Sequence, residues 1–198
     1  MPKRKDEAAP PYATLRALVH WLQAKQVPAL VIGGVAASLL GRPRLTQDVD
    51  VVVLLSENRW EEFLNAGARF GFVPRIRNAI DFARRARVLL VNHKTSGIDV
   101  DISLAALPFE KESITRATWM NVGGLSLPLP TPEDLIIMKA VAHRPRDLAD
   151  IESVLDAHPK LDLRRVRRWV GEFSTALEMP DILKDLEAIL GRHRKRKK

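Results

Sequence analysis

A pair of glycines followed by two closely spaced aspartates constrains this chain more than any other feature. One strand-like segment ends at Gly33 and Gly34, and a second, β-branched one begins with Asp48 and Asp50. Because side chains alternate between the faces of a strand, Asp48 and Asp50 project in the same direction. Two such carboxylates repel one another unless a cation lies between them, and oxygen ligands of this kind suit Mg²⁺. The double glycine lets the backbone approach a phosphate closely, and the helix expected after it adds its positive end.

A third acidic segment repeats this pattern. Asp99 and Asp101 alternate with apolar residues over 97–103. If this strand lies beside the one that carries Asp48 and Asp50, one of its acids joins them. Three converging carboxylates can hold two divalent cations for in-line displacement at phosphorus, and one of them can accept the proton of an attacking hydroxyl group. Such transfer needs mainly positioning and charge neutralisation, so no cysteine, histidine or serine nucleophile is required.

The order of predicted elements favours an α/β arrangement in the first part of the chain and helices alone in the rest. Alternation predicts the strands, and apolar spacing with capping residues such as Thr131 predicts the helices. Strands are expected at 29–32, 49–55, 88–92 and 98–103, with strand-like stretches from 72 and over 119–128. Helices are expected at 12–25, 35–40, 57–68, 109–117, 132–142, 147–157, 163–177 and 181–190, and residues 77–85 are ambiguous.

The chain is therefore expected to divide into four regions. They are a disordered basic tail over 1–10, an α/β domain over 11–130, a helical region over 131–190 and a disordered basic tail over 191–198. No apolar run approaches the roughly twenty residues of a membrane-spanning helix, and the N-terminus lacks the apolar segment of a signal peptide. The chain has no cysteine, which excludes disulfides and thiolate metal sites. We expect a cytoplasmic protein without a membrane partner.

Positive charge is concentrated at the two ends. The net charge is +8, yet nine of the 32 Lys and Arg residues lie within 3–5 and 192–198. The remaining 23 nearly balance the 24 acidic residues, so the body of the chain is close to neutral. Basic tails can bind RNA or another polyanion through counterion release, or they can simply keep the protein in solution. Both alternatives stay open.

The ordered set of Gly33-Gly34, Asp48-x-Asp50 and a later strand with Asp101 resembles the polymerase-beta-like nucleotidyltransferase superfamily. The resemblance implies a mixed sheet flanked by helices, followed by a helical C-terminal region. It also implies an enzyme that transfers a nucleoside monophosphate from an NTP, with Mg²⁺, and releases pyrophosphate. Two ions are expected, and Mn²⁺ is an alternative to Mg²⁺.

A closer likeness is to small bacterial members of this superfamily related to the AbiEii and MenT toxins. Residues 41–50 look like the Gly-x-x-Arg-x-Thr-x-Asp-hydrophobic-Asp signature of that group. Residues 130–139, followed by 146–151, resemble its second block. The likeness extends from about residue 12 to residue 156 and covers most of the chain.

The resemblance assigns roles to individual residues. Asp48 and Asp50 match the metal-binding pair, and Asp101 matches the third acid, which binds metal and activates the acceptor. Gly33 and Gly34 match the phosphate-contacting turn. Many relatives have Gly-Ser there, so a contact through the backbone alone is expected. The role of Asp99 is not fixed by the pattern.

The second block extends the predicted nucleotide site. Lys139 matches a helix lysine expected to contact the triphosphate, and either Asp147 or Asp150 matches the acid that follows it. Arg44 either contacts substrate or braces its loop, and Thr46 either bonds a metal-site carboxylate or only favours the strand.

The acceptor and the biological role are the least constrained part of the prediction. The basic tails and the toxin-like resemblance favour a tRNA 3′ end or another RNA, and they suggest a cognate antitoxin as protein partner. A protein hydroxyl group or a small antibiotic is an alternative acceptor, because the body of the chain is near neutral. A non-catalytic partner or antitoxin that keeps the fold is a further alternative.

Overall fold

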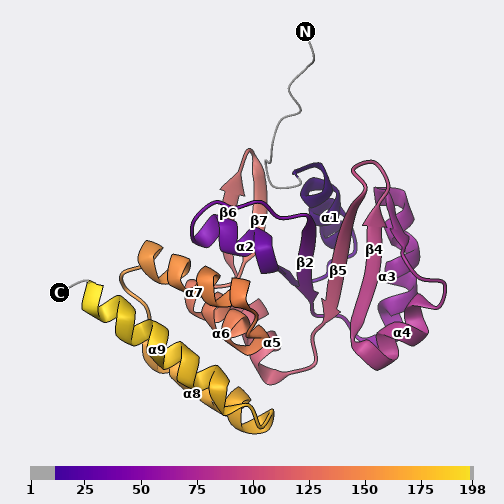
Figure 1. The fold of residues 1–198 in the computed structure, drawn as a ribbon. Coiled ribbons are helices and arrows are strands. Elements are labelled where there is room, and N and C mark those ends of the chain that lie inside the picture. Colours follow the sequence, from indigo (N-terminus) through magenta and orange to yellow (C-terminus); the bar gives the residue numbers. More distant parts are fainter. Residues whose placement is uncertain (1–11, 197–198) are drawn as a thin grey trace. The chain divides into compact units, whose positions relative to one another are not determined.

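The computed structural model describes residues 12–196, which fall into two compact units (Figure 1). Unit 1 comprises the described residues up to Val35 together with Arg44–Leu129. Unit 2 comprises Ala36–Pro43 together with the described residues from Pro130 onward. The predicted N-terminal tail over 1–10 and the last two residues of the predicted C-terminal tail lie outside the described residues.

Unit 1 is built on a five-stranded mixed sheet with the strand order β1-β2-β5-β4-β3. Its strands are β1 (Ala29–Ile32), β2 (Asp48–Val53), β3 (Phe72–Pro74), β4 (Val88–His93) and β5 (Ile98–Leu104). β2 and β5 run parallel, and the other neighbouring pairs run antiparallel. The predicted hairpin across 94–97 is confirmed as β4–β5, and β5 lies beside β2, as convergence of the acids requires.

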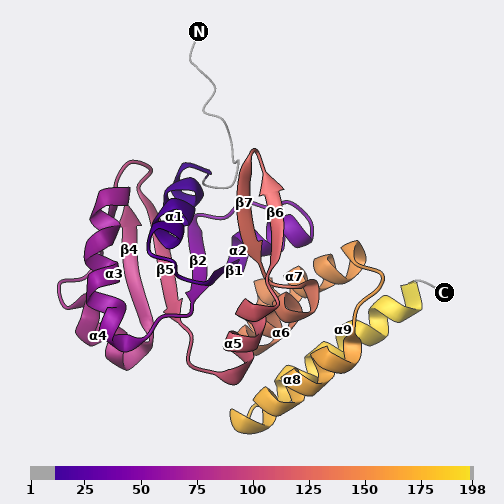
Figure 2. The same ribbon diagram turned by 180° about the vertical axis from the view of Figure 1, so that it is seen from behind.

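The two faces of this sheet differ because apolar and acidic side chains alternate along β5 and at the start of β2. One face carries the buried residues Val49, Val51, Val53, Leu89, Val91, Val100, Ile102 and Leu104. The helices α1 (Tyr12–Ala24) and α3 (Trp60–Gly67) lie on this face (Figure 2). Trp21 stacks there on Phe63 and Phe72, with ring centroids 4.2 and 5.1 Å away. The aspartates of β2 and β5 therefore project from the opposite face.

The rest of unit 1 consists of short elements around this sheet. Two 3₁₀ helices (Glu57–Arg59 and Ala68–Phe70) flank α3. Most of the ambiguous segment 77–85 belongs to α4 (Ala79–Ala86), which packs against β4. The helix α5 (Pro108–Thr115) precedes a separate two-stranded sheet of β6 (Thr118–Val122) and β7 (Leu125–Leu129). This second hairpin confirms the strand-like prediction over 119–128.

Unit 2 consists mainly of the helices α6 (Pro132–Ala142), α7 (Pro145–Ala157), α8 (Leu163–Ala176) and α9 (Pro180–Arg196). The hydroxyl group of Thr131 accepts a hydrogen bond from the Asp134 amide at 3.2 Å and so begins α6 as predicted. α6 packs against α7 and α8, and α8 lies beside α9 in both ribbon views (Figures 1 and 2). No helix within residues 12–196 has the length and apolar character of a bilayer span.

The last helix is longer than predicted. α9 does not end at Leu190 but continues to Arg196, so residues 191–196, which we expected in a disordered tail, are helical. Arg192 lies 2.9 Å and Arg196 3.8 Å from the carboxylate of Glu152 on α7. Cations in the last turn also favour the negative end of the helix. The basic composition predicted a tail because these tertiary partners are distant in sequence.

The helix after β1 belongs to both units. This helix, α2 (Gly33–Leu40), begins in unit 1, two residues earlier than predicted, and ends in unit 2. His158 Nε2 lies 2.8 Å from the Leu40 carbonyl oxygen, and the Arg42 guanidinium donates to Asp156 at 2.6 Å. These contacts explain why 36–43 groups with the C-terminal helices, which a single division at residue 130 does not anticipate.

Candidate active site

The predicted acids of unit 1 lie on one face of two neighbouring strands. In the parallel register of β2 and β5, Asp48 is opposite Asp99, and Asp50 is opposite Asp101. Residues opposite one another across a strand pair share a face, and so do residues two apart. All four carboxylates therefore project from the face opposite the apolar core. The side chains of Asp99 and Asp101 are each 43% exposed, so solutes can reach them.

Gly33 lies directly against one of these acids. Ile32, the last residue of β1, pairs with Asp50 of β2, and the chain then turns into α2 with a φ of +62° at Gly33. A Cβ atom at this position would lie only 1.8 Å from Asp50 Oδ2. Only glycine fits here, because both the left-handed backbone and the carboxylate exclude a side chain. The turn predicted to bind phosphate thus adjoins the predicted metal-binding pair.

Gly34 faces the loop that leads into β2. A Cβ atom at Gly34 would lie 2.4 Å from Thr46 Oγ1 and 3.3 Å from an Arg44 guanidinium nitrogen. The Thr46 hydroxyl group donates to Asp48 Oδ1 at 2.9 Å, so of the two roles considered for Thr46 the structure shows the bond to a site carboxylate. Arg44 donates to the carbonyl oxygen of Leu45 at 3.2 Å, which braces the loop. Arg44 and Thr46 thus fill the space that a side chain at position 34 would need.

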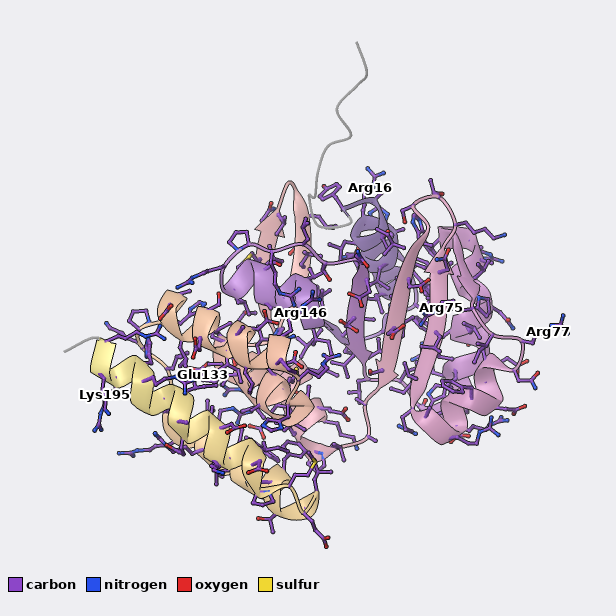
Figure 3. The ribbon with its side chains drawn as sticks, in the orientation of Figure 1. Arg16, Arg75, Arg77, Glu133, Arg146 and Lys195 are labelled. Carbon is purple, nitrogen blue, oxygen red and sulfur yellow. The ribbon has the colours of Figure 1, made fainter. Side chains whose placement is uncertain are left out.

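Arg75 is a member of this site that the sequence analysis missed. One guanidinium nitrogen donates to Asp99 Oδ2 at 2.6 Å, and another donates to Asp101 Oδ1. Asn92 donates to the other oxygen of Asp99 at 2.8 Å. Figure 3 shows Arg75 over β4 and β5, whereas Arg77 points away from the sheet. Nothing in the sequence distinguishes these two arginines, since the contacts of Arg75 depend on the strand order.

The two acids of β5 have opposite pKa shifts. Burial raises the pKa of Asp101; the charge of Arg75 opposes this, and the negative charges of Asp48 and Asp99 add to it. The hydrogen bond from Asn92 lowers the pKa of Asp99, and Arg75 contributes in the same direction against the effect of burial. Asp101 is thus the one of the pair that binds a proton more readily.

The aspartate oxygens of this site are the kind of donor that a hard divalent cation prefers, but they do not form a complete coordination shell. Within residues 12–196, no three carboxylate or histidine side chains gather closely enough to hold a metal ion as they stand. Asp48 Oδ2 and Asp101 Oδ2 accept no hydrogen bond from a described residue, whereas Asp101 Oδ1 is bound to Arg75. Mg²⁺ commonly takes one or two protein carboxylates and completes its shell with phosphates and water. Asp48 and Asp50 fit that requirement without a third acid.

The second predicted block forms a buried charge network within unit 2. Lys139 Nζ lies 2.7 Å from Asp147 Oδ1 and 2.9 Å from Asp150 Oδ2, and its side chain is only 6% exposed. Arg144 donates to Asp147 Oδ2 at 2.6 Å. Burial alone would raise the pKa of Asp147, but the hydrogen bonds and charges of Arg144 and Lys139 lower it. Both acids that the sequence could not separate contact Lys139; its contact with a triphosphate stays a prediction.

A comparison with protein families identifies this chain over most of its length. The family model described as "Nucleotidyltransferase of unknown function (DUF6036)" matches residues 14–187, which is most of the chain. No curated protein matches this chain in sequence. The family match agrees with the broader of the two resemblances, whereas the narrower one to AbiEii and MenT stays a prediction.

Solved structures of similar fold are nucleotidyltransferase-like. An antigenic nucleotidyltransferase-like protein from Paracoccidioides brasiliensis is 15% identical, with a TM-score of 0.54 and coverage of 88% of this chain and 91% of that one. ANT(2")-Ia in complex with adenylyl-2"-tobramycin is 17% identical, with a TM-score of 0.56 and coverage of 84% and 98%. The lincosamide antibiotic adenylyltransferase LnuA, bound to lincomycin, is 12% identical, with a TM-score of 0.52 and coverage of 73% and 96%. At these identities the likeness shows the fold alone.

Proposed function

The chain belongs to the family of nucleotidyltransferases of unknown function (DUF6036), and we propose that it transfers a nucleoside monophosphate from an NTP to an acceptor hydroxyl group. In this reaction the acceptor oxygen forms a bond to the α-phosphorus, and the bond from that phosphorus to the bridging oxygen breaks. Pyrophosphate leaves, and the hydroxyl proton moves to a carboxylate. The observation that carries the proposal is the register of β2 and β5, which groups the acids beside the Gly33 turn.

Each residue of the site has a distinct part in this reaction. The backbone amides of Gly33 and Gly34, at the start of α2, bind phosphate oxygens, since the positive end of a helix favours anions. Asp48 and Asp50 would hold Mg²⁺ or Mn²⁺, which neutralises the charge of the triphosphate when bound. Asp101 accepts the hydroxyl proton on Oδ2, the oxygen that no described residue occupies. Thr46 fixes the orientation of Asp48 through its hydrogen bond.

The direct test compares wild type with the double variant Asp48→Asn/Asp50→Asn. The measurement is binding of each NTP, as a non-hydrolysable α,β-methylene analogue with Mg²⁺, by titration calorimetry. We expect at least about a tenfold loss of affinity in the variant, because the carboxylates bind the cation that the triphosphate carries. Glu61→Gln, an exposed acid of α3 without an ion-pair partner among the described residues, is the matched control. Equal affinities in wild type and double variant would refute the metal role.

RNA is the acceptor class that we favour. The last turns of α9 present Arg194 and Lys195 to solvent, and neither makes an ion pair with a described residue. A small antibiotic is the second candidate, because ANT(2")-Ia and LnuA carry antibiotic ligands in the structures of similar fold. The family model does not separate these acceptors.

Charge removal on α9 distinguishes the two acceptors. Arg194→Ser/Lys195→Ser leaves Arg192 and Arg196 to pair with Glu152, so the helix keeps its contacts with α7. For an RNA acceptor, binding of a tRNA pool should weaken. The negative slope of log affinity against log salt should become less steep, by about 1 to 2. The control is Arg77→Ser/Lys94→Ser, which removes two exposed cations of unit 1 and so has the same net charge as the α9 variant. An unchanged slope together with nucleotide transfer to an aminoglycoside or lincosamide would favour the small-molecule acceptor.

The toxin role, the antitoxin partner and the cytoplasmic location stay predictions. A stable complex with a second protein and no NTP turnover would favour the non-catalytic alternative. Transfer activity that the second protein inhibits would favour the toxin.

A further inference from the structure

We propose that Arg75 is a positioning residue of this site. One nitrogen of its guanidinium group binds Asp99, which serves as the anchor, and another nitrogen binds Asp101 and holds that carboxylate in one orientation. This inference rests on the proposed function. It assigns a part to Asp99, whose role the sequence pattern left open, and it adds a residue that no sequence motif indicates.

The Arg75 side chain crosses one strand and bridges two carboxylates of the next. Arg75 follows β3, and its amide donates to the Leu90 carbonyl oxygen at 2.9 Å, so its backbone is fixed beside β4. In the strand order β4 separates β3 from β5, and the Arg75 side chain therefore crosses β4 to reach β5. One nitrogen binds Asp99 at 2.6 Å and another binds Asp101. A planar guanidinium group with two donors can bridge two carboxylates at fixed spacing, and a lysine ammonium cannot reproduce that geometry.

Asp99 is fixed independently of Arg75. Asn92 donates to Asp99 Oδ1 at 2.8 Å and to the Gly97 carbonyl oxygen at 3.0 Å, so the amide ties Asp99 to the β4–β5 turn. Both oxygens of Asp99 are thus hydrogen-bonded, one to Asn92 and one to Arg75. Asp99 is therefore an anchor rather than a fourth metal ligand. Because both oxygens of the anchor are bound, the second nitrogen of Arg75 fixes one oxygen of Asp101 and leaves Oδ2 for the reaction.

The positive charge of Arg75 allows a positioning role to be distinguished by experiment from the role of a metal-binding residue. Four aspartates project from the same face, and Arg75 is a cation among them. Its removal makes the cluster more negative, so the affinity for a divalent cation should stay the same or increase. Turnover should fall nevertheless, because the Asp101 carboxylate is no longer held in place. A residue that only ties the strands together would change neither quantity.

The experiment compares Arg75→Ala with Arg77→Ala, an exposed arginine two residues away that makes no ion pair with a described residue. In Arg75→Ala we expect kcat to fall about 10- to 100-fold, the range for partners that orient ligands, with KM for the NTP within about twofold. Mn²⁺ binding without nucleotide, followed by electron paramagnetic resonance, should be as tight as in wild type or tighter. Millimolar guanidinium should restore part of the activity of Arg75→Ala, whereas ammonium should not.

Two further variants test the anchor. Asp99→Asn should also lower kcat, and the double variant Arg75→Ala/Asp99→Asn should lose less than the product of the two single losses, because both act on Asp101. Arg75→Lys should remain impaired, and it provides the same kinetic test if Arg75→Ala does not fold. An unchanged kcat in Arg75→Ala, a loss no larger than that in Arg77→Ala, or Mn²⁺ binding that weakens in step with kcat would overturn the inference.

The inference can fail separately from the proposed function. If wild type shows no transfer, and the affinity for the NTP is the same in wild type and in Asp48→Asn/Asp50→Asn, the proposed function fails. The positioning role is then still measurable from a crystal structure of Arg75→Ala, in which Asp101 should occupy several rotamers. A single, unchanged Asp101 rotamer in that crystal would contradict the role of Arg75 whatever the activity.

Discussion

The acid face of unit 1 and the charge network of unit 2 contain similar residues in opposite settings. On the acid face, four aspartates project from two strands, and Arg75 pairs with two of them. In unit 2 each buried acid has a buried cation beside it, in the pairs Lys139–Asp147, Lys139–Asp150 and Arg165–Asp134, and the exposed Arg144 pairs with Asp147 as well. The first set is half-exposed and rich in negative charge, whereas the second is buried and balanced.

The difference indicates which charges serve the fold and which serve a ligand. Buried charges persist only when they are paired, so the network of unit 2 is explained by the folded chain itself. Unbalanced carboxylates on an accessible face repel one another, and this cost is relieved when a cation binds. The comparison therefore predicts that variants in unit 2 change stability, and that variants on the acid face change activity.

The largest effect is expected at Lys139. Lys139→Met keeps the apolar stem but leaves Asp147 and Asp150 without their shared cation, which should lower the free energy of unfolding by about 3 to 4 kcal/mol. Urea unfolding measures this loss, and Lys160→Met, at an exposed lysine of unit 2, is the control. If Lys139→Met keeps its stability but loses affinity for the NTP, Lys139 is the phosphate ligand that the resemblance implies. The conclusion that the charges of unit 2 serve the fold is then wrong.

The second effect is expected at Asp50. Asp50→Asn should lower transfer activity by about 10²-fold, equivalent to about 2.7 kcal/mol, because it removes a charge that acts on the reacting phosphate. Its free energy of unfolding should change little, since Asp50 lies on the accessible acid face and not in the buried charge network of unit 2. Both quantities are measured on one preparation by kinetics and urea unfolding. A variant that unfolds more easily and keeps its turnover would show that Asp50 stabilises the fold. That result would contradict the prediction that the acid face serves activity.

The third effect is expected at the glycine turn. Gly33→Ala should lower the free energy of unfolding by roughly 1 to 2 kcal/mol and should also lower activity, because its Cβ atom displaces Asp50. Gly97→Ala is a matched control, since Gly97 has a φ of +71° and a Cβ atom there meets no atom within 4 Å. The control carries the backbone strain without the clash. Equal activity in the two alanine variants would show that the contact with Asp50 has no catalytic consequence.

Features that depend on local sequence could be predicted. Alternation predicts that Asp48 and Asp50 share one face of their strand, and Thr131 and Pro132 predict the start of α6. The convergence of Asp48, Asp50 and Asp101 on one face was predicted on the condition that the two strands are neighbours, and β2 and β5 are. Their roles in catalysis stay predictions.

Features that depend on tertiary partners could not be predicted. Arg75 reaches Asp101 only because β3 is two strands away from β5 in the sheet order, which no local pattern encodes. The end of α9 was misplaced because Glu152, the partner of Arg192, lies on a different helix. The pairing of Lys139 with both Asp147 and Asp150 depends on how α6 packs against α7.

The smallest effect sharpens the comparison within the acid face itself, where Asp99 and Asp101 have opposite pKa shifts. The pKa of Asp99 is lowered, so its charge adds stability above the pKa of the unfolded chain, and this stability is lost as the pH falls through the folded pKa. The pKa of Asp101 is raised, so its charge costs stability above the folded pKa, and the cost disappears as the pH falls. At neutral pH, Asp99→Asn should therefore be less stable than wild type, and Asp101→Asn should be more stable.

Both differences should be a few tenths of a kcal/mol, because side chains this exposed are screened by solvent. Urea unfolding of the three proteins from pH 7 to pH 3 measures them. As the pH falls, the difference for Asp101→Asn should shrink first, because the raised pKa of Asp101 is reached before the lowered pKa of Asp99. If the two variants shift stability in the same direction at pH 7, Asp99 and Asp101 do not differ in the way that an anchor and a reactive group should. Such a result would reduce the acid face to four equivalent carboxylates.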